Sequence, residues 1–172
     1  AGKTFEFGSS KKALAAGKYK LTVSLKKGTD ITSDSMAKAC LKSAELEVAD
    51  DGKAAVTVEL GSVTFGTLTA YAADWKIYSG TSASGTTTDA QITGKDDEGH
   101  VTQIKFELPD NSYDGVFVNM FIDAMNTTQD AYIAMDFANV GKSDSASSGD
   151  NKDDEADEKV TEITPSNKKK EF

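Results

Sequence analysis

The chain has 172 residues and carries 19 basic residues, all of them lysines, against 28 acids, for a formal net charge of −9. The length suits one domain of about 140 residues plus a tail. An acidic chain without a basic patch cannot neutralise phosphates, which excludes nucleic acid as a partner. No apolar run approaches the roughly 18 residues of a membrane helix, so we expect no membrane insertion of this chain.

Residues 1–14 are expected to form a lead-in to the folded domain. After them the hydrophobic pattern has a period of two, which is typical of a strand with one buried face. The apolar members of this pattern, separated by polar residues, are Tyr19, Leu21, Val23 and Leu25. The pattern predicts one half-buried strand.

A short helix is predicted in the run SDSMAKACLK, residues 33–42. Ser33 or Asp34 can cap the first turn of such a helix. Met36, Ala39 and Cys40 have the i, i+3 and i+4 spacing of one helical face, so we expect these three side chains to lie together.

A β-hairpin is the clearest local prediction, in the run ELEVADDGKAAVTVEL, residues 45–60. Apolar and polar residues alternate on both sides of Asp51-Gly52. An Asp-Gly pair tolerates the positive φ angles of a tight turn, which is typical of a hairpin.

Later stretches predict further strands over residues 65–78, 102–108, 116–122 and 132–137, with a polar loop at 81–91. Residues 116–122 are apolar on both faces and should form a central, fully covered strand. Six or seven strands with short turns predict an all-β fold, an antiparallel β-sandwich with one short helix. The side chains expected to point inward from these strands are Leu68, Trp75, Ile77, Ile104, Phe106, Leu108, Ile133, Met135 and Phe137.

The folded part is expected to end near Val140, which places the domain at residues 15–140. Residues 141–172 are rich in charge and nearly free of aliphatic side chains. Such a segment cannot bury enough apolar surface to offset the entropy of ordering. We therefore expect a disordered acidic linker or spacer there.

Catalytic chemistry has little support in the sequence, and we expect no enzyme. His100 is the only histidine and lies in a turn-like run, where a solvated side chain is expected. Nothing in the sequence brings it to Cys40, the only cysteine, and buried cysteines are common. The run Asp110–Gly115 has oxygen ligands at alternating positions, but Phe121 stands where a calcium loop needs its acid. We interpret that run as a turn between strands.

Two long segments resemble the NEAT (near-iron-transporter) domain family. The first is GKYKLTVSLKKGTDITSDSMAKACLKSAELEVADDGKAAVTVEL, residues 17–60. The second half comprises VTQIKFELPD, residues 101–110, and VFVNMFIDAMNTTQDAYIAMDF, residues 116–137. The elements come in the family's order over residues 15–140. The resemblance implies an immunoglobulin-like β-sandwich on the surface of a Gram-positive bacterium, where many members hold haem between the short helix and the last hairpin.

The resemblance also implies roles for residues of the predicted helix. Ser35 matches the serine whose hydroxyl binds a haem propionate, and Met36 matches the apolar residue over the porphyrin. Cys40 falls one helical turn further on, where haem-binding members often have a tyrosine. The only lysines near the helix that are candidates for the propionates are Lys26, Lys27 and Lys38.

The last hairpin departs from the family's pattern. Haem-binding members have Tyr-x-x-x-Tyr there, in which the first tyrosine ligates iron. This chain has Thr128 and Tyr132 at that spacing or, in a register set from Met125, Thr127 and Ala131. Neither register supplies the usual ligand pair. The candidates to replace it are Met36, Cys40, Met125 and Tyr132, since sulfur and phenolate oxygen both bind haem iron.

The resemblance favours a cell-surface domain that binds haem or a haem-related ligand for iron acquisition, with haem or a host haemoprotein as its partner. The alternative is an adhesion module for proteins or glycans that has lost haem ligation. The expected location is extracellular, with an anchor outside this chain, and we expect a monomer.

Overall fold

The structure is a computed structural model that describes residues 3–142. All of the predicted spacer beyond Lys142 therefore lies outside the described residues. None of the residues 3–142 is α-helical, and no helix among them is long and apolar enough to cross a membrane.

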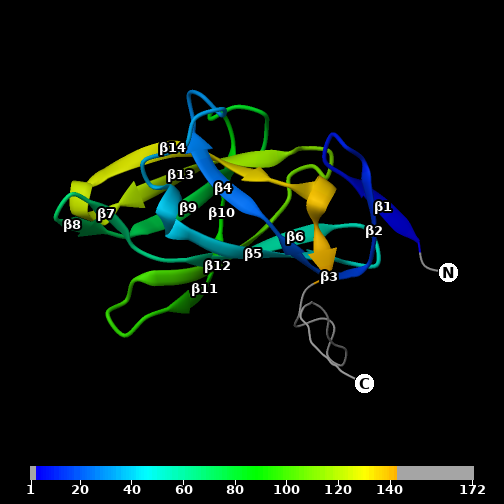
Figure 1. Cartoon of the computed structure of the whole chain (residues 1–172), viewed down its shortest axis with the longest axis horizontal. Helices are drawn as coiled ribbons and strands as arrows, with labels where there is room; N and C mark the ends of the chain where they lie inside the picture. Colours follow the sequence, from blue (N-terminus) through cyan, green and yellow to red (C-terminus); the bar gives the residue numbers. More distant parts are fainter. Residues whose placement is uncertain (1–2, 143–172) are drawn as a thin grey trace, which may run out of the picture. The chain divides into compact units, whose positions relative to one another are not determined.

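Two antiparallel sheets form the body of the molecule (Figure 1). The five-stranded sheet contains, in order, β10 (Thr87–Asp89), β9 (Ala72–Tyr78), β13 (Gly115–Ile122), β14 (Thr127–Met135) and β4 (Val23–Lys27). The six-stranded sheet contains, in order, β11 (Gln91–Lys95), β12 (Val101–Glu107), β6 (Ala54–Leu60), β5 (Leu41–Val48), β3 (Gly17–Leu21) and β15 (Gly141–Lys142).

Short elements complete the described chain. Two small hairpins pair β1 (Thr4–Phe7) with β2 (Lys12–Ala15) and β7 (Val63–Phe65) with β8 (Leu68–Ala70). Three single-turn 3₁₀ helices are η1 (Lys38–Cys40), η2 (Asp123–Met125) and η3 (Phe137–Asn139).

The core lies between the inner faces of the two main sheets. Alternate residues of each strand point inward, as the period-two pattern predicted. Burial of each such aliphatic side chain stabilises the fold by roughly 1.5–3 kcal/mol. The fully inaccessible members are Leu46, Val56, Val58 and Ile104 of the six-stranded sheet and Leu25, Val118, Met120, Ala131 and Ile133 of the five-stranded sheet.

The predicted strand over residues 18–25 is two strands in different sheets. It breaks at Thr22, whose carbonyl accepts a hydrogen bond from the Asp136 amide. Tyr19 and Leu21 point into the core from β3, and Leu25 points into it from β4. Both sheets face the same core, so the alternation continues through the break. The period alone could not reveal the change of sheet.

The predicted hairpin of residues 45–60 is confirmed as β5 and β6. Its turn is closed by the Ala49 amide on the Lys53 carbonyl and the Gly52 amide on the Ala49 carbonyl. Gly52 has φ +89°, a conformation that costs glycine little. The Asp-Gly signal therefore identified the turn correctly.

The predicted helix over residues 33–42 is wrong. Asp34 forms an isolated β-bridge with Lys26, and only the three residues of η1 are helical. Met36 is 68% exposed whereas Cys40 is 1% exposed, so the two do not share a face. Two hydrogen bonds, from the Lys27 amide to the Ser33 carbonyl and from the Ser35 amide to the Leu25 carbonyl, hold the start of this segment against the edge of β4, and one 3₁₀ turn follows.

Residues 65–78 were expected to form one strand, and they instead contribute to β7, β8 and β9. Trp75 and Ile77 point inward as predicted, whereas Leu68 is 46% exposed at the β7–β8 turn. The polar stretch 81–91, predicted as a loop, contains β10 at the sheet edge. Gly66 at φ +65° makes the tight turn that separates β7 from β8.

Residues 4–15, within the expected lead-in and its junction with the domain, form the β1–β2 hairpin. Phe7 is fully buried and Leu14 is 6% exposed, both within the core. The ring of Phe7 lies 5.7 Å from that of Phe137. The hairpin is therefore packed as part of the sandwich.

Candidate functional site

The outer face of β13 and β14 is half-buried, and it carries aromatic side chains. Residues 116–122 were expected to be covered on both faces, but only the inner side chains are buried, and Phe117 and Phe121 are intermediate. Phe117 is paired with Tyr132 across the two strands, with ring centroids 4.7 Å apart and planes at 53°. Phe117, Phe121 and Tyr132 thus leave an aromatic part of this sheet face only partly covered, and exposed apolar surface can bind a ligand or a partner.

A polar group stands beside these aromatics. Asp130 is paired with Asn119, and its Oδ1 accepts hydrogen bonds from Asn119 Nδ2 at 2.9 Å and from the Tyr78 hydroxyl at 2.8 Å. The bond to Asp130 raises the pKa of Tyr78, with burial contributing in the same direction. Three strands are thus tied together on their outer face, which holds this surface rigid.

The structure distinguishes the two registers of the last hairpin. Thr128, Asp130 and Tyr132 alternate on the outer face of β14, paired with Phe121, Asn119 and Phe117. Ala131 is fully buried on the inner face, so the Thr127–Ala131 pair cannot face a ligand together. Thr128 and Tyr132 are therefore the two positions that share the exposed face.

Tyr132 is held by a glycine. A Cβ atom placed on Gly115 would lie 2.6 Å from Tyr132 Cζ and 2.7 Å from its hydroxyl, so the phenol ring lies directly over that glycine. Burial raises the pKa of Tyr132, and the Asp114 carboxylate raises it further. Both effects disfavour the phenolate that an iron ligand needs.

The segment after β4 places Ser35 inside and Met36 outside. The Ser35 amide donates to the Leu25 carbonyl, and the Ser35 side chain is 2% exposed, with Oγ accepting from the Ala37 amide at 3.1 Å. The hydroxyl that the resemblance assigned to a propionate thus binds the chain's own backbone. Met36 follows with its thioether at the surface.

Lysines surround this segment. Asp34 Oδ1 lies 2.6 Å from Lys26 Nζ, and Asp34 Oδ2 lies 3.2 Å from Lys38 Nζ. The hydrogen bond from Lys26 and then that from Lys38 lower the pKa of Asp34. One carboxylate between two ammonium groups leaves a net positive charge next to Met36. Lys26 is also paired with Tyr132 across β4 and β14, which brings this lysine to the aromatic face.

Cys40 is part of the core and has no place on this face. Its side chain is buried, and burial raises the pKa of the thiol to about 12. A neutral, inaccessible thiol is a poor ligand and a poor nucleophile.

Cys40 should accordingly react with a thiol reagent such as dithionitrobenzoate only after unfolding. We expect negligible release of the chromophore from native protein near neutral pH and one equivalent in denaturant. Stoichiometric reaction of the native protein within seconds would show that the thiol is exposed and would return Cys40 to the set of possible ligands.

Met125 lies in η2 at the tip of the β13–β14 hairpin and is 46% exposed. Asn126, at φ 51°, ends this turn in the left-handed conformation that asparagine tolerates. Asp123 anchors the tip, because its Oδ1 accepts from the Tyr71 amide at 2.9 Å. The tip is therefore fixed, with the Met125 side chain accessible to solvent.

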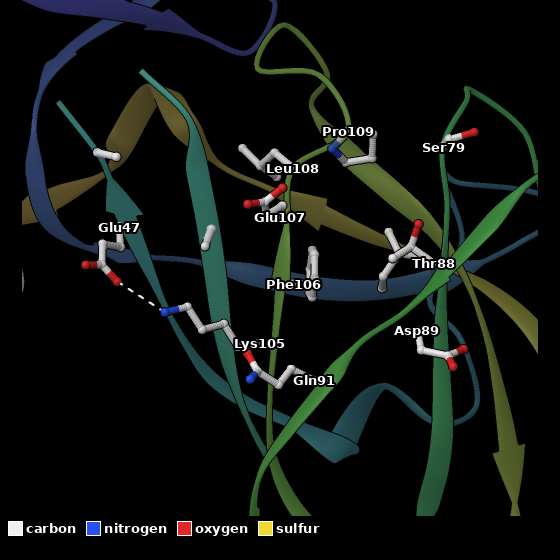
Figure 2. Close-up of a pocket in the computed structure, with 13 residues that line it drawn as sticks. Glu47, Ser79, Thr88, Asp89, Gln91, Lys105, Phe106, Glu107, Leu108 and Pro109 are labelled. Carbon is white, nitrogen blue, oxygen red and sulfur yellow. Dashed lines mark hydrogen bonds and ion pairs between the residues drawn. The ribbon is translucent and has the colours of Figure 1, made fainter. Parts of the chain in front are cut away.

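A cleft of about 770 Å³ lies away from these residues, where the chain crosses from β10 to β11 (Figure 2). Figure 2 shows Glu47 paired with Lys105 on one side, Thr88 and Asp89 on the other, and Phe106 between them. Its lining also includes Gln91 and Glu107. The mixture of an apolar floor and polar walls differs from the aromatic face of β13 and β14.

The other candidates have structural partners. Asp110 accepts from the amide and the hydroxyl of Ser112, and Asp114 accepts from the Ser9 amide. The Asp110 carboxylate thus stabilises the turn before β13, and the Asp114 carboxylate ties that turn to the β1–β2 hairpin. His100 was expected to be a solvated turn residue, but its ring is stacked on that of Tyr71.

Comparison with known proteins bears on the fold. No protein-family profile matches the chain, and no curated protein matches it significantly in sequence. A solved structure of a mutant IsdX2-NEAT5 domain in complex with haem is similar, with a TM-score of 0.50 and 21% sequence identity. The match covers 72% of this chain and 97% of that one. The described domain therefore has a NEAT-like, immunoglobulin-like β-sandwich fold.

The sequence predictions missed most of the aromatic face. Phe117, Phe121 and Asn119 were assigned to a doubly covered strand, and Asp130 and Tyr78 received no role. A signal was present, because Asn119 interrupts an otherwise apolar strand, and a buried amide needs a partner. Asn119 therefore indicates that the outer face of this strand is accessible.

Proposed function

We propose that this domain binds haem, or a closely related tetrapyrrole, at the outer face of β13 and β14 beside the segment 34–38. One observation carries the proposal: on this NEAT-like fold Lys26 is paired with Tyr132, which packs against Phe117, and Asp34 links Lys26 to Lys38 in the segment that bears the exposed Met36. Binding, with no reaction catalysed, is the activity this arrangement supports.

The residues present suit haem in three respects. The half-buried aromatic rings offer apolar area to a flat macrocycle, and such rings contribute strongly to binding energy. Lys26 and Lys38 can exchange their ion pairs with Asp34 for ion pairs with the haem propionates. The exposed thioether of Met36 is a soft ligand of the kind that haem iron accepts. Haem would supply the iron, and Met36 would hold it as a ligand while Phe117 and Tyr132 would contact the macrocycle.

Among the residues assigned from the resemblance, Met36 is the most suitable ligand for the iron. Cys40 and Ser35 are both buried, and Ser35 Oγ accepts a hydrogen bond from the Ala37 amide. The hydroxyl of Tyr132 lies over Gly115, and the pKa of its phenol is raised. Met125 and Thr128 flank the face at the hairpin tip, where they can contact the edge of the macrocycle.

A haemin titration followed by the Soret band tests the proposal. We expect a saturable one-to-one shift that Met36→Ala abolishes or moves, because the axial ligand is lost. Tyr132→Phe keeps the ring and should keep the shift. Ile92→Ala, which trims another exposed aliphatic side chain on β11, is the matched control and should behave like the parent protein.

A flat titration of the parent protein would overturn the haem proposal. Loss of the Soret shift in Tyr132→Phe but not in Met36→Ala would retain haem and assign the iron to Tyr132. Equal weakening in Met36→Ala and Ile92→Ala would show nonspecific association of haemin with apolar surface.

The cleft between β10 and β12 favours a second candidate, recognition of a protein or glycan by an adhesion module. Its carboxylates and amide can form the hydrogen bonds that hydroxyl or amine groups need, above the apolar floor of Phe106. In either case we propose that the domain acts outside the cell. Binding of a glycan array lost on Gln91→Ala, with haemin binding absent, would favour this second candidate.

A further inference from the structure

The turn between β11 and β12 groups a histidine with two carboxylates. One ligand atom from each of Asp96, Glu98 and His100 lies within 4.8 Å of the others. His100 Nδ1 lies 3.0 Å from Asp96 Oδ2 and 3.6 Å from Glu98 Oε1. We propose that this turn binds a divalent transition-metal ion of the zinc class, at a site separate from the haem proposal.

The two separations from His100 Nδ1 fit ligands on one ion. Zinc binds imidazole nitrogen and carboxylate oxygen at about 2.0–2.2 Å, which places neighbouring ligand atoms about 2.8–3.6 Å apart in octahedral or tetrahedral coordination. Both distances from His100 Nδ1 fall in this range. An ion can therefore replace the imidazole proton without a change in the path of the turn.

The two carboxylate oxygens of Asp96 have different roles in this turn. Oδ1 accepts from the Glu98 amide and from the His100 amide, both at 2.9 Å, and so fixes the backbone. Oδ2 faces His100 Nδ1 and is the oxygen offered to an ion. Glu98 is an exposed side chain, and its only described polar contact is with His100. Binding of an ion by Glu98 would therefore break no other described contact of the Glu98 carboxylate.

An aromatic contact outside the turn orients the imidazole. The ring of Tyr71 stacks on that of His100, with centroids 3.6 Å apart and planes at 8°. The His100 side chain is 25% exposed, so the ring has little freedom to rotate away from the carboxylates. Because the ring is already ordered, binding an ion loses less conformational entropy.

The donor set selects the class of ion. Imidazole nitrogen suits zinc, copper and nickel, whereas calcium takes six to eight oxygen ligands. Three protein ligands leave at least one position on a tetrahedral ion for water or for a group from another molecule. Calcium should therefore compete poorly with zinc for this turn.

Isothermal titration of the whole chain with zinc chloride tests the proposal. We expect one saturable site that His100→Phe weakens about tenfold or more, since the loss of even an outer-sphere partner commonly costs 10–100-fold in affinity. Phenylalanine keeps a ring to stack on Tyr71 and removes the nitrogen. Glu98→Gln, on an exposed side chain, should also weaken binding and carries the test if His100→Phe fails to fold.

Asp97→Asn is the matched control, since it removes the same charge from the neighbouring exposed position, which is not one of the three ligands. It should leave the zinc affinity unchanged. If Asp97→Asn and Glu98→Gln weaken zinc binding equally, the affinity depends only on the negative charge of this region. That result would overturn the proposed site. So would a parent protein without saturable binding, or an affinity that is unchanged in His100→Phe.

Discussion

Replacing Gly115 by alanine should destabilise the domain by roughly 1–3 kcal/mol, the range in which overpacking a tightly packed site falls. The added Cβ would lie 2.3 Å from the Ile133 carbonyl oxygen and 2.6 Å from Tyr132 Cζ. A phenol ring can move aside, but the carbonyl belongs to the β14 ladder. The pairing of Gly115 with Ala134 would have to open, and the Tyr132 ring would lose its place on the outer face.

Urea unfolding of Gly115→Ala beside Gly80→Ala measures this effect. Gly80 is the matched control, because a Cβ there meets nothing within 4 Å. We expect a clear drop in the unfolding midpoint for Gly115→Ala alone, together with a changed near-ultraviolet dichroism from Tyr132. Identical midpoints for the two variants would show that β13 and β14 are not as close at Gly115 as described.

Truncating Phe7 to alanine should cost about 3–5 kcal/mol, as for other fully buried aromatic residues. Phe7 is 0% exposed and packs on Phe137, which follows β14 along the chain. The β1–β2 hairpin would lose its main attachment to the core. The loss tests whether residues 1–14 belong to the fold.

Phe5→Ala is the matched comparison in the same strand, since Phe5 is only partly buried against the core. It should cost clearly less than Phe7→Ala in the free energy of unfolding, measured by chemical denaturation. If Phe7→Ala unfolds at the midpoint of the parent protein, residues 1–14 are a dispensable lead-in and the described packing of Phe7 is wrong.

The sequence was most informative where a side chain's direction follows from local period. Ile77, Ile104 and Ile133 were predicted inward because a strand alternates its faces, and each is buried. The Asp51-Gly52 turn was found because its conformation needs particular residues. Such features depend on near neighbours along the chain.

Features set by distant contacts could not be predicted in this way. The segment 33–42 has helical spacing, but its backbone pairs with β4, and tertiary pairing overrides a weak helical propensity. Cys40 consequently faces the core, and Met36 faces solvent. The stack of Tyr71 on His100 joins residues that no short-range pattern connects.

The candidate face shows the same division. Thr128 and Tyr132 were identified together as one possible register, and the strand's alternation decides for that register because Ala131 is buried. The position of the Tyr132 ring depends on the absence of a side chain at Gly115, which lies in a different strand. A ligand role for Tyr132 could therefore not be judged from its own strand.

Paramagnetic broadening of amide signals by ferric haem tests the central proposal most directly. In nitrogen-15 spectra of the domain titrated with haemin, we predict selective broadening of residues 34–38, Lys26 and Tyr132, complete at one equivalent. Amides at Asp89 and Lys105, in the cleft, should stay sharp. Signals that stay equally sharp throughout the titration would contradict haem binding at the β13–β14 face. Broadening centred on Asp89 and Lys105 would contradict it as well.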